Sequence, residues 1–557
     1  MENKPQNFID QIIQDDLTSG FDSKELRFRF PPEPNGYLHI GHAKAIGLNF
    51  GLGQKYNAPV NLRFDDTNPE KEEVEYVKAI KNDVLWLGFN WDKVTYSSDN
   101  FQQLYDWAII LIKKGRAYID SQTSEEMAEQ KGAPTTVGKN SPYRERDVKE
   151  NLTIFNEMKN GVHKEGLHVL RAKIDMSHPN MLMRDPIIYR VLNKPHHRTS
   201  TDWKIYPMYD WAHGQCDYIE QVSHSLCSLE FKPHRDLYDW FLESIKPETQ
   251  SLSVLPKQRE FARLNLSYTI MSKRKLAVLV EKGLVDGWDD PRMPTISGLR
   301  RRGYTPKSIR EFINKVGVAK RENVIDVSLL EFCVREDLNK EADRKMVVID
   351  PIKLTITNYP EGKTEELESE DNPEKDSIKK RIIPFNKHLY IEREDFKEEA
   401  NRKFFRLTIG KEVRLKSAYI IKGTGLIKDA AGNIVEILCE YDPKSKSGSG
   451  TEESLRKVKG TLHWVTQKES INIIVNIYDR LFKVEAPGSN EKGDYLDDIN
   501  PDSLKVTHAK AEPSLKEVVP GETFQFQRKG YFTVDKKSKA DNIIFNKTVG
   551  LRDSWKK

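Results

Sequence analysis

The segment Pro31-Pro32-Glu33-Pro34-Asn35-Gly36 limits the possible folds of this chain more than any other feature of its sequence. Its three prolines fix φ and lack a backbone N–H, so the segment cannot be helical. Residues 26–30 before it alternate between apolar and polar, as a strand does, and residues 37–52 after it have the apolar spacing of a helix. The chain is therefore predicted to pass from strand to helix through one tight turn.

The next elements repeat this order. Residues 60–64 have the pattern of a second strand, which ends at Asp65, and Val77, Ile80 and Val84 then share one face of a helix. Strands that alternate with helices favour a parallel sheet. We therefore expect an α/β domain in the N-terminal part of the chain.

Length and composition bound the class of protein. At about 150 residues per domain, 557 residues suggest three to four domains, and 37% hydrophobic residues can form real cores. The net charge is only +4, so a nucleic-acid-binding face would have to gather the basic residues locally. There is no apolar run of membrane-spanning length, and residues 1–20 are polar. The four cysteines lack CxxC spacing, which indicates a reduced, cytoplasmic protein without a zinc site.

The pattern of apolar residues and turns changes along the chain. Helical patterns dominate residues 265–340. Short β-rich runs then recur, at residues 345–349, 413–422 and 471–477, and turns containing Gly, Pro and Asn separate them. This pattern favours antiparallel barrels or sandwiches. The polar segment 361–380 is expected to be a solvated loop.

Two short motifs could carry chemistry. His39 and His42 lie three residues apart where a helix should begin, and a helix N-terminus presents N–H groups that suit a phosphate. The alternative is that they are two surface histidines on an ordinary amphipathic helix. Met271-Ser272-Lys273 opens a basic cluster, and such a cluster is usually a solvated face.

Together the two motifs resemble the double signature of the class I aminoacyl-tRNA synthetases. The chain is similar to the bacterial-type glutaminyl-tRNA synthetase family in stretches spread over nearly its whole length. These stretches are residues 31–44, 61–69, 138–144, 206–210, 223–231, 263–275, 287–304 and 549–555.

The resemblance implies a multidomain fold of α/β plus β class. It predicts a Rossmann-type catalytic domain with a parallel sheet, an inserted domain that binds the tRNA acceptor end, a helical subdomain with the Met-Ser-Lys loop, and two C-terminal antiparallel β-barrels that bind the anticodon. The expected bounds are 1–100 and 211–264 for the catalytic domain, 101–210 for the insertion, 265–340 for the helical part and 341–557 for the barrels.

The resemblance also implies a reaction. With ATP and Mg²⁺, L-glutamine would form an adenylate, and the glutaminyl group would then pass to the 2′-hydroxyl of the terminal adenosine of the tRNA for glutamine. A monomer without a membrane is expected. Three alternatives stay open: a non-discriminating glutamyl-tRNA synthetase, a non-catalytic tRNA-binding relative and a small-molecule nucleotidyltransferase.

The family's site residues can be carried over one by one. His39, His42 and Lys273 match the catalytic positions, with the lysine on a mobile loop that moves onto the triphosphate. The positions that match the ATP-binding site are Glu33, Pro34, Asn35, His39, Ile40, Gly41, His42, Ala43, Lys44, Ala45, Ile46, Ser228, Arg263, Leu264, Met271, Ser272 and Lys273. Ser228 stands where close relatives often carry threonine, and it keeps the hydroxyl.

For glutamine itself, Asp65 matches the residue that binds the ammonium group, although on sequence alone it could equally cap a helix. Arg29 and Tyr209 match the side-chain pocket. Related glutamyl enzymes carry arginine where this chain has Cys227, and a neutral thiol leaves a glutamate carboxylate without a counter-charge. One departure is Gln221, where a glycine is usual.

The tRNA-binding positions are basic or amide residues. Lys320 and Arg321 match family residues near the inner elbow of the tRNA, whereas Arg300-Arg301-Arg302 could simply lie in solvent. The residues that match positions near the anticodon are Arg344, Arg406, Arg414, Lys416, Gln525 and Arg528. Lys416 often corresponds to an arginine, so its role is the least certain of the six.

Overall fold

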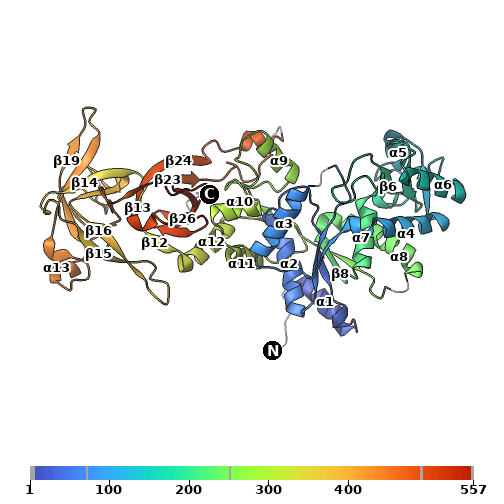
Figure 1. The fold of residues 1–557 in the computed structure, drawn as a ribbon, viewed down its shortest axis with the longest axis horizontal. Helices are drawn as coiled ribbons and strands as arrows, with labels where there is room; N and C mark the ends of the chain where they lie inside the picture. The colour runs from blue at the N-terminus through green and yellow to red at the C-terminus, as the bar shows by residue number, and fades with distance from the viewer. Residues whose placement is uncertain (1–6, 71–72, 250–251, 490–492, 553–557) are drawn as a thin grey trace. The chain divides into compact units, whose positions relative to one another are not determined.

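The computed structural model describes residues 7–70, 73–249, 252–489 and 493–552, so Trp555, at the end of the family resemblance, lies outside the described residues. The chain forms two compact units. The first contains residues 1–265 and 313–325, and the second contains residues 266–312 and 326–557. Figure 1 names the elements of both units.

A parallel sheet forms the centre of the first unit, which confirms the α/β prediction. Strand β1 pairs with β2 and β2 with β3, all in parallel, and β8 pairs with β9 in parallel. The N–H of Ser223, just before β8, donates to the carbonyl of Arg27, just before β1, at 3.0 Å, so β8 runs beside β1. The elements are β1 Phe28–Phe30, α2 Ile40–Tyr56, β2 Val60–Phe64, α3 Val74–Trp86, β3 Val94–Tyr96, β8 His224–Ser228 and β9 Lys257–Phe261.

A second, antiparallel sheet interrupts the parallel one along the chain, in the order β4-β5-β6-β7. It shares a hydrophobic core with α4, α7 and α8, in which Phe155 and Ile188 from the insertion meet Phe101, Trp211 and Phe241. The elements are β4 Ala117–Asp120, β5 Val169–Ala172, β6 Ile187–Val191, β7 Ile205–Pro207, α4 Phe101–Lys113, α7 Tyr209–Ile219 and α8 Arg235–Ile245, with α5 Ser124–Lys131 and α6 Val148–Lys159 around them. Helix α1, Phe8–Thr18, lies instead beside α2 and β8, because its Asp10 accepts from Lys55 and Tyr56 and its Asp16 contacts His224.

The second unit joins helices to two barrel-like sheets of seven strands each. Its helices after β9 are α9 Lys273–Glu281, α10 Ile296–Arg302 and α12 Val327–Glu341. Strand β10 Asn265–Leu266 and helix α11 Pro306–Val316 each have residues in both units, and β11 Val324–Ile325 belongs to the first. The first barrel contains β14 Pro351–Ile356, β17 His388–Glu392, β18 Glu412–Leu415, β19 Ile420–Lys428, β20 Ile434–Tyr441, β21 Thr461–Leu462 and β22 Val465–Thr466. The second contains β12 Asp343–Lys345, β13 Val347–Val348, β23 Ile471–Tyr478, β24 Leu504–Ala511, β25 Thr523–Phe526, β26 Gly530–Val534 and β27 Ile544–Val549.

The two barrels do not follow one another along the chain. The chain starts the second barrel with β12 and β13, builds the whole first barrel, and returns with β23 to complete the second. Most strand pairs are antiparallel, as predicted, but four are parallel: β14 with β20 and β18 with β21 in the first barrel, and β23 with β27 and β12 with β25 in the second. These parallel pairs join strands that are distant in sequence, which local periodicity cannot reveal.

The expectation of a loop at residues 361–380 was right for residues 361–364 and 371–379 but wrong for the segment between them. Residues Glu365–Glu370 form β15, which pairs with β16, Lys380–Phe385. Leu367 and Ser369 are buried and alternate with exposed glutamates, so the segment has the period of a half-buried strand. The many charges concealed that period.

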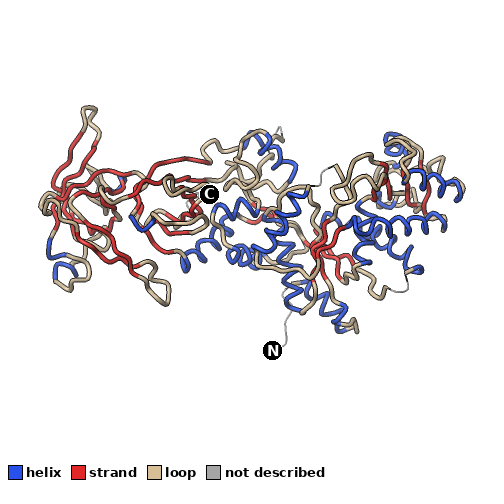
Figure 2. The backbone as a smooth tube through the Cα atoms, viewed as in Figure 1, coloured by secondary structure: helices blue, strands red, loops and turns tan. Residues whose placement is uncertain are grey.

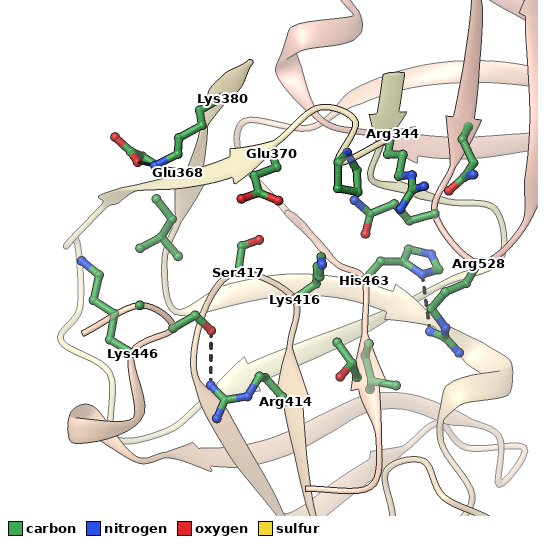
Figure 3. Close-up of a pocket in the computed structure, with 18 of the residues that line it drawn as sticks. Arg344, Glu368, Glu370, Lys380, Arg414, Lys416, Ser417, Lys446, His463 and Arg528 are labelled. Carbon is green, nitrogen blue, oxygen red and sulfur yellow. Dashed lines mark hydrogen bonds and ion pairs between the residues drawn. The ribbon is translucent and has the colours of Figure 1, made fainter. Parts of the chain in front are cut away.

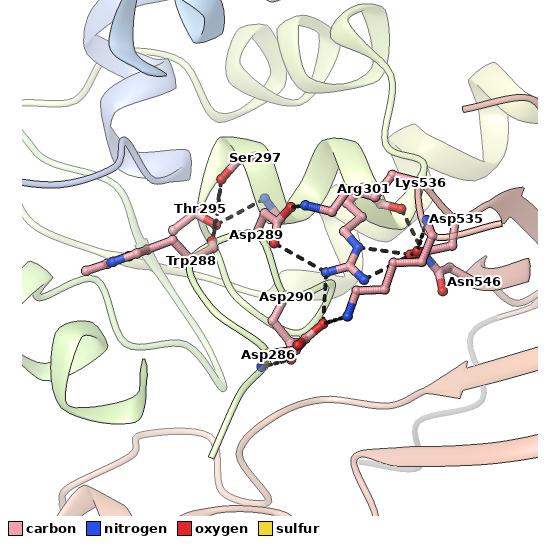
Figure 4. Close-up of polar contacts among 12 residues, drawn as sticks. Asp286, Trp288, Asp289, Asp290, Thr295, Ser297, Arg301, Asp535, Lys536 and Asn546 are labelled. Atoms are coloured by element: carbon pink, nitrogen blue, oxygen red, sulfur yellow. Dashed lines mark hydrogen bonds and ion pairs between the residues drawn. The ribbon is translucent and has the colours of Figure 1, made fainter. Parts of the chain in front are cut away.

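The basic run at residues 300–302 lies at the end of α10 and docks this helix against the second barrel (Figure 4). The Nε of Arg301 donates to Asp535 at 2.9 Å, and its Nη1 lies 3.3 Å from both Asp286 and Asp289. Gly303 ends the helix at φ +99°, and a Cβ there would come within 1.8 Å of Thr533 Oγ1. Arg301 therefore joins α10 to the second barrel at a place where the two lie too close together for a side chain at residue 303.

Among the residues that the structure describes, no helix has both the length and the apolar character needed to cross a membrane.

We expect Arg301→Ala to destabilise the second unit by about 3 kcal/mol, because the side chains of Arg301 and Asp535 are only 7% and 1% exposed and removing one partner leaves a buried charge. Burial alone would raise the pKa of Asp535, but hydrogen bonds from Arg301 and Asn546 lower it overall. The stabilisation is therefore present at neutral pH and is lost as the pH falls through this lowered pKa.

Calorimetric unfolding of the full chain at neutral and acid pH measures this loss. Lys536→Ala is the matched control, because its side chain is 56% exposed and its ion pair with Asp289 should contribute little. Equal melting of Arg301→Ala and wild type at neutral pH would contradict the structural role.

Candidate active site and nucleic-acid interface

The turn between β1 and α2 is held against the end of β2. The N–H of Asp65, just after β2, donates to the carbonyl of Pro32 at 3.1 Å, and the N–H of Glu73 donates to Pro34 at 3.1 Å. Within the turn the amide of Asn35 donates to the carboxylate of Glu33. The proline-rich segment thus lies beside the carboxyl end of a parallel strand, where open α/β sheets bind ligands.

The structure fixes the roles of the two histidines. His39 is the N-cap of α2 rather than part of it, and its Nδ1 accepts from the N–H of Gly41 at 3.1 Å. His42 Nδ1 accepts from the N–H of His39 at 3.1 Å, and the two ring centroids are 3.9 Å apart. Because a backbone N–H can only donate, each neutral imidazole carries its proton on Nε2. Both rings are therefore fixed as Nε2–H donors at a helix N-terminus.

Several residues of the predicted ATP-binding set lie in the core. The side chains of Ile40, Ala43 and Ile46 are fully buried on α2, so only their backbone could serve a ligand. Lys44 is also buried, and its Nζ donates to the carbonyl of Ala262 at 2.7 Å. Burial lowers the pKa of Lys44. This lysine joins α2 to the chain segment just before Arg263-Leu264.

Of the remaining predicted ATP positions in the first unit, Arg263 is exposed and forms ion pairs with Glu230 at 3.5 Å and Glu322 at 3.8 Å. Leu264 is buried, and Ser228 donates to Glu230 at 2.8 Å. Arg263 and Ser228 thus share the carboxylate of Glu230.

The second signature motif lies in the second unit. Lys273 is the first residue of α9, and Ser272 is the N-cap, with its hydroxyl accepting from the N–H of Lys275 at 3.5 Å. Ile270 and Leu276 on either side pack into a core with Leu481, Phe482 and Tyr495, which belong to the segment between β23 and β24. The Met-Ser-Lys turn is therefore attached to that segment by apolar contacts.

The predicted ammonium-binding carboxylate, Asp65, is 3% exposed. Its Oδ1 accepts from the hydroxyl of Ser97 at 3.2 Å, and its Oδ2 lies 3.9 Å from Nδ1 of His213. None of these contacts caps a following helix, so the geometry favours the binding role over the capping alternative.

A buried ionic cluster lies beside this carboxylate. Asp217, on α7, accepts from Nε of Arg29 at 3.0 Å and from Nη2 of Arg63 at 2.7 Å. It also accepts from the hydroxyls of Ser225 at 2.7 Å and Tyr238 at 2.9 Å. Burial would raise the pKa of Asp217, but the two guanidinium groups hold it well below its ordinary value. The carboxylate is therefore ionised and fully hydrogen-bonded.

Aromatic side chains pack beside this ionic cluster. His213 Nε2 accepts from Nη2 of Arg29 at 2.8 Å, and burial lowers the pKa of His213. The ring is therefore neutral and carries its proton on Nδ1, which lies 3.9 Å from Oδ2 of Asp65 and 3.4 Å from Nη2 of Arg63. Tyr209 stacks on His213 with centroids 4.9 Å apart and an interplanar angle of 25°. Phe231 covers Tyr209 from another side, at 5.3 Å.

Cys227 lies on β8 with its thiol 3.9 Å from the carbonyl of Arg259. Burial raises the pKa of this thiol to about 12, so it is neutral at physiological pH. Its partner in the parallel register is Glu260, which forms a two-bond pair with Arg235. The cations near this thiol are thus already paired with carboxylates.

Asp66, His196 and His197 come together in a way that could suggest a metal site. However, His196 Nε2 lies 2.8 Å from the carbonyl of Asp66, and its Nδ1 accepts from the N–H groups of Arg198 and Thr199 at 3.2 Å. Both ring nitrogens are therefore committed to hydrogen bonds. Asp66 also accepts two hydrogen bonds from Ser98, so the cluster fits a structural latch better than a cation site.

Gln221, the departure from the family pattern, lies after the C-cap of α7 at φ +56°. This left-handed conformation explains why glycine is usual there. The side-chain amide compensates, because Nε2 donates to Tyr218 at 2.8 Å while Oε1 accepts from the backbone of Ser253 and Val254 at 3.0 Å. The residue ends a helix and does not belong to the pocket wall.

In the second unit, a hollow of about 990 Å³ collects five of the predicted anticodon residues (Figure 3). They are Arg344, Arg414, Lys416, Gln525 and Arg528. Figure 3 shows Lys416 near the middle of the hollow, with Glu368 of β15 and Lys380 of β16 on one side and Arg528 on the other. Six cationic side chains and three glutamates line this hollow.

The arginines of this first hollow differ in how far they are committed. Arg414 donates to the carbonyls of Ser445 at 3.1 Å and Ser454 at 2.8 Å, which holds the loop after β20. Arg528 forms a two-bond pair with buried Asp395, at 2.6 and 2.7 Å. The buried Nε of Arg344, in contrast, has no hydrogen-bond partner among the described residues.

A second hollow of about 640 Å³ shares Thr461, Leu462 and Arg528 with the first. It contains Arg406, the sixth predicted anticodon residue, whose Nη1 donates to the carbonyl of Glu394 at 3.1 Å. Lys320 and Arg321 are exposed residues of the first unit, and Lys320 lies 5.0 Å from the ring of Phe8.

The residues that sequence reasoning missed are the buried polar ones, Asp217, Arg63 and His213, and the hairpin residues of the first hollow. A signal was present for the arginines, because Arg29 and Arg63 each lie between apolar neighbours in a short strand. Such a position demands a buried partner. Nothing local identified Asp217 as that partner.

Comparison with known proteins gives the family. Residues 25–340 match the catalytic domain of the class I tRNA synthetases (E and Q), and residues 342–442 and 461–535 match their anti-codon binding domains. A glutamine–tRNA ligase of Rhodopirellula baltica is 55% identical, with 99% of this chain and 90% of that protein covered. The glutamine–tRNA ligases of Salmonella schwarzengrund and Enterobacter sp. are 53% and 52% identical, with 100% of this chain and 99% of each relative covered.

A solved glutamate-tRNA synthetase of Elizabethkingia anophelis is 18% identical, with a TM-score of 0.43 over 57% of this chain and 71% of that one, which is too distant to add weight. The family models, together with relatives more than 50% identical over nearly the whole chain, identify the family. This chain belongs to the E and Q family of class I tRNA synthetases.

Proposed function

We propose that this protein ligates L-glutamine to the tRNA for glutamine in two steps: formation of glutaminyl-adenylate from ATP, then transfer to the 2′-hydroxyl of the terminal adenosine. The observation that carries the choice of glutamine is the charge balance around Cys227. The thiol is neutral, and Arg29 and Arg63 are paired with Asp217. A glutamate carboxylate would find no uncommitted cation there, whereas a neutral amide needs none.

In the first step the chain's own residues position and stabilise charge. The Nε2–H groups of His39 and His42, with the N-terminus of α2, suit the phosphates of ATP. Lys273 supplies a mobile positive charge as negative charge develops on the leaving pyrophosphate. Asp65 takes the ammonium group of glutamine. Mg²⁺ would neutralise the phosphates and is expected to be held mainly by ATP and water.

In the second step the tRNA is recognised through the C-terminal barrels. The two hollows of the barrels offer cations, an amide in Gln525 and a half-exposed aromatic ring, which is the mixture that unpaired bases need. The orphaned Nε of Arg344 supports a ligand in the first hollow. We propose that these hollows read the anticodon, that Lys320 and Arg321 contact the tRNA elbow, and that the enzyme acts as a cytoplasmic monomer.

Aminoacylation of purified tRNA with labelled glutamine and, separately, labelled glutamate tests the proposal. We expect charging with glutamine only. Charging with glutamate would indicate a non-discriminating glutamyl enzyme. Absence of charging with either amino acid, by folded protein that still binds the tRNA, would indicate a non-catalytic relative.

Lys273→Ala should lower kcat for adenylate formation by about 10²–10³, because its charge is needed mainly in the transition state. The KM for glutamine should change little. Pyrophosphate exchange in the presence of tRNA measures both constants. Arg274→Ala removes the neighbouring, exposed cation and is the control. If both variants lose activity equally, the effect is one of general charge and the assignment of Lys273 fails.

Asp65→Asn should raise the KM for glutamine about 10- to 100-fold, because a hydrogen bond to a charged group is lost, and should leave ATP binding unchanged. Asp66→Asn is the matched control. Asp66 accepts from Ser98 and His197, so its loss should lower the melting temperature instead. If the Asp65→Asn protein has a lower melting temperature than wild type but an unchanged KM for glutamine, the role of Asp65 is structural.

Cys227→Arg should shift the ratio of kcat/KM toward glutamate, because a guanidinium pairs with a carboxylate but not with an amide. The shift should be partial, since Glu260 lies beside residue 227 in the parallel register and competes for the new cation. Cys227→Ser, which stays small and neutral, is the control. If the ratio stays at its wild-type value in a folded, active Cys227→Arg protein, this residue does not line the side-chain pocket.

A further inference from the structure

Two phenylalanines, Phe404 and Phe405, line the second hollow, and Phe405 lies outside the residues predicted to bind tRNA. Phe405 is 50% exposed, although burying a phenylalanine is normally favourable. Five cationic side chains and one glutamate line the hollow around it. An exposed ring in so positive a setting is poorly suited to an apolar partner and well suited to a planar group that carries negative charge beside it.

The ring is attached to a fixed stretch of backbone. The next residue, Arg406, is held by the carbonyl of Glu394 at 3.1 Å and by the carboxylate of Asp395 at 3.3 Å. Leu407 after it is fully buried. Lys459 Nζ lies 5.1 Å from the centroid of the Phe405 ring, close enough for a cation–π contact. The ring is therefore largely positioned before any ligand arrives.

The second hollow adjoins the first one. Thr461, Leu462 and Arg528 line both, so a single extended ligand can occupy the two hollows across this shared rim. A strand of unpaired nucleotides has the required chemistry, because its phosphates match the cations and each base offers a flat face for stacking. An acidic peptide would match the cations but would have no need of the ring.

We propose that Phe405 is a stacking platform for one unpaired nucleobase of the tRNA anticodon loop, whose neighbouring nucleotides occupy the first hollow. The proposal rests on the proposed function and adds to it a residue that contributes affinity through its π-face rather than through charge. Arg406 and Lys459 would hold the flanking phosphates.

The test uses the full-length enzyme and transcripts of the tRNA for glutamine that carry 2-aminopurine at one anticodon-loop position each. Stacking quenches the fluorescence of 2-aminopurine, so wild type should quench one position through Phe405. Phe405→Leu should lose that quenching and bind tRNA about 5- to 100-fold more weakly. Phe405→Tyr, which keeps the ring, should restore both.

Salt dependence separates stacking from charge. Phe405→Leu should keep the wild-type slope of log affinity against log salt, whereas Lys459→Ala should reduce it. Phe332→Leu is the matched control, because Phe332 is 43% exposed on α12 and lines neither hollow. It should leave affinity and quenching unchanged.

The outcomes distinguish this proposal from the proposed function. If Lys416→Ala weakens binding while Phe405→Leu keeps wild-type affinity and quenching, the stacking proposal is overturned and anticodon reading by the barrels stands. If the wild-type enzyme charges the tRNA but neither variant affects binding, the proposed ligation stands, whereas the stacking proposal and the proposed reading of the anticodon by these hollows both fail. If Phe405→Leu and Phe332→Leu weaken binding equally, the effect is not specific to the hollow and the stacking proposal is also overturned.

Discussion

The carboxylate of Asp217 is the interaction on which the amino-acid end of this enzyme depends. It lies on α7 and accepts hydrogen bonds from Arg29 on β1, Arg63 on β2, Ser225 on β8 and Tyr238 on α8. Three strands of the parallel sheet and two helices are therefore fixed by one ionised group. A buried guanidinium is tolerated only when its charge is balanced and its donors are used, so the cluster is stable as a whole and costly to break singly.

This cluster also determines the chemistry of the pocket. Arg29 is fully buried, and its donors are committed to Asp217, Ser225, His213 and the backbone, so it offers no unpaired cation to a substrate carboxylate. His213 in turn takes its proton on Nδ1 and faces Asp65 with it. The arrangement fits a substrate with a charged ammonium group and a neutral side chain. The same ionic cluster thus supports the fold and underlies the proposed preference for an amide.

The barrels use cations in two ways. Arg528 and Arg414 are committed to Asp395 and to backbone carbonyls, so they shape the hollows. Lys416 and Lys459 have exposed ammonium groups on flexible stems, which can follow a phosphate at little entropic cost. Arg528, one of the predicted anticodon residues, therefore supports the structure of the barrels as well as lining the hollows. A net charge of only +4 is compatible with RNA binding because the surplus is concentrated in these hollows.

The sequence by itself determined the local elements and the family. The prolines at 31–34 forced the turn, period-2 and period-3.6 patterns predicted the parallel sheet and its helices, and the two motifs identified the class, because all of these depend on neighbours along the chain. Tertiary structure decided what depends on residues far apart in the sequence. Asp217 neutralises Arg29 and Arg63, and Arg301 docks a helix rather than facing solvent. The first barrel is inserted in the sequence between two parts of the second. Tertiary structure also decided the protons of His39 and His42, since a tautomer follows from the partner that each nitrogen meets, and no periodicity of the chain records that partner.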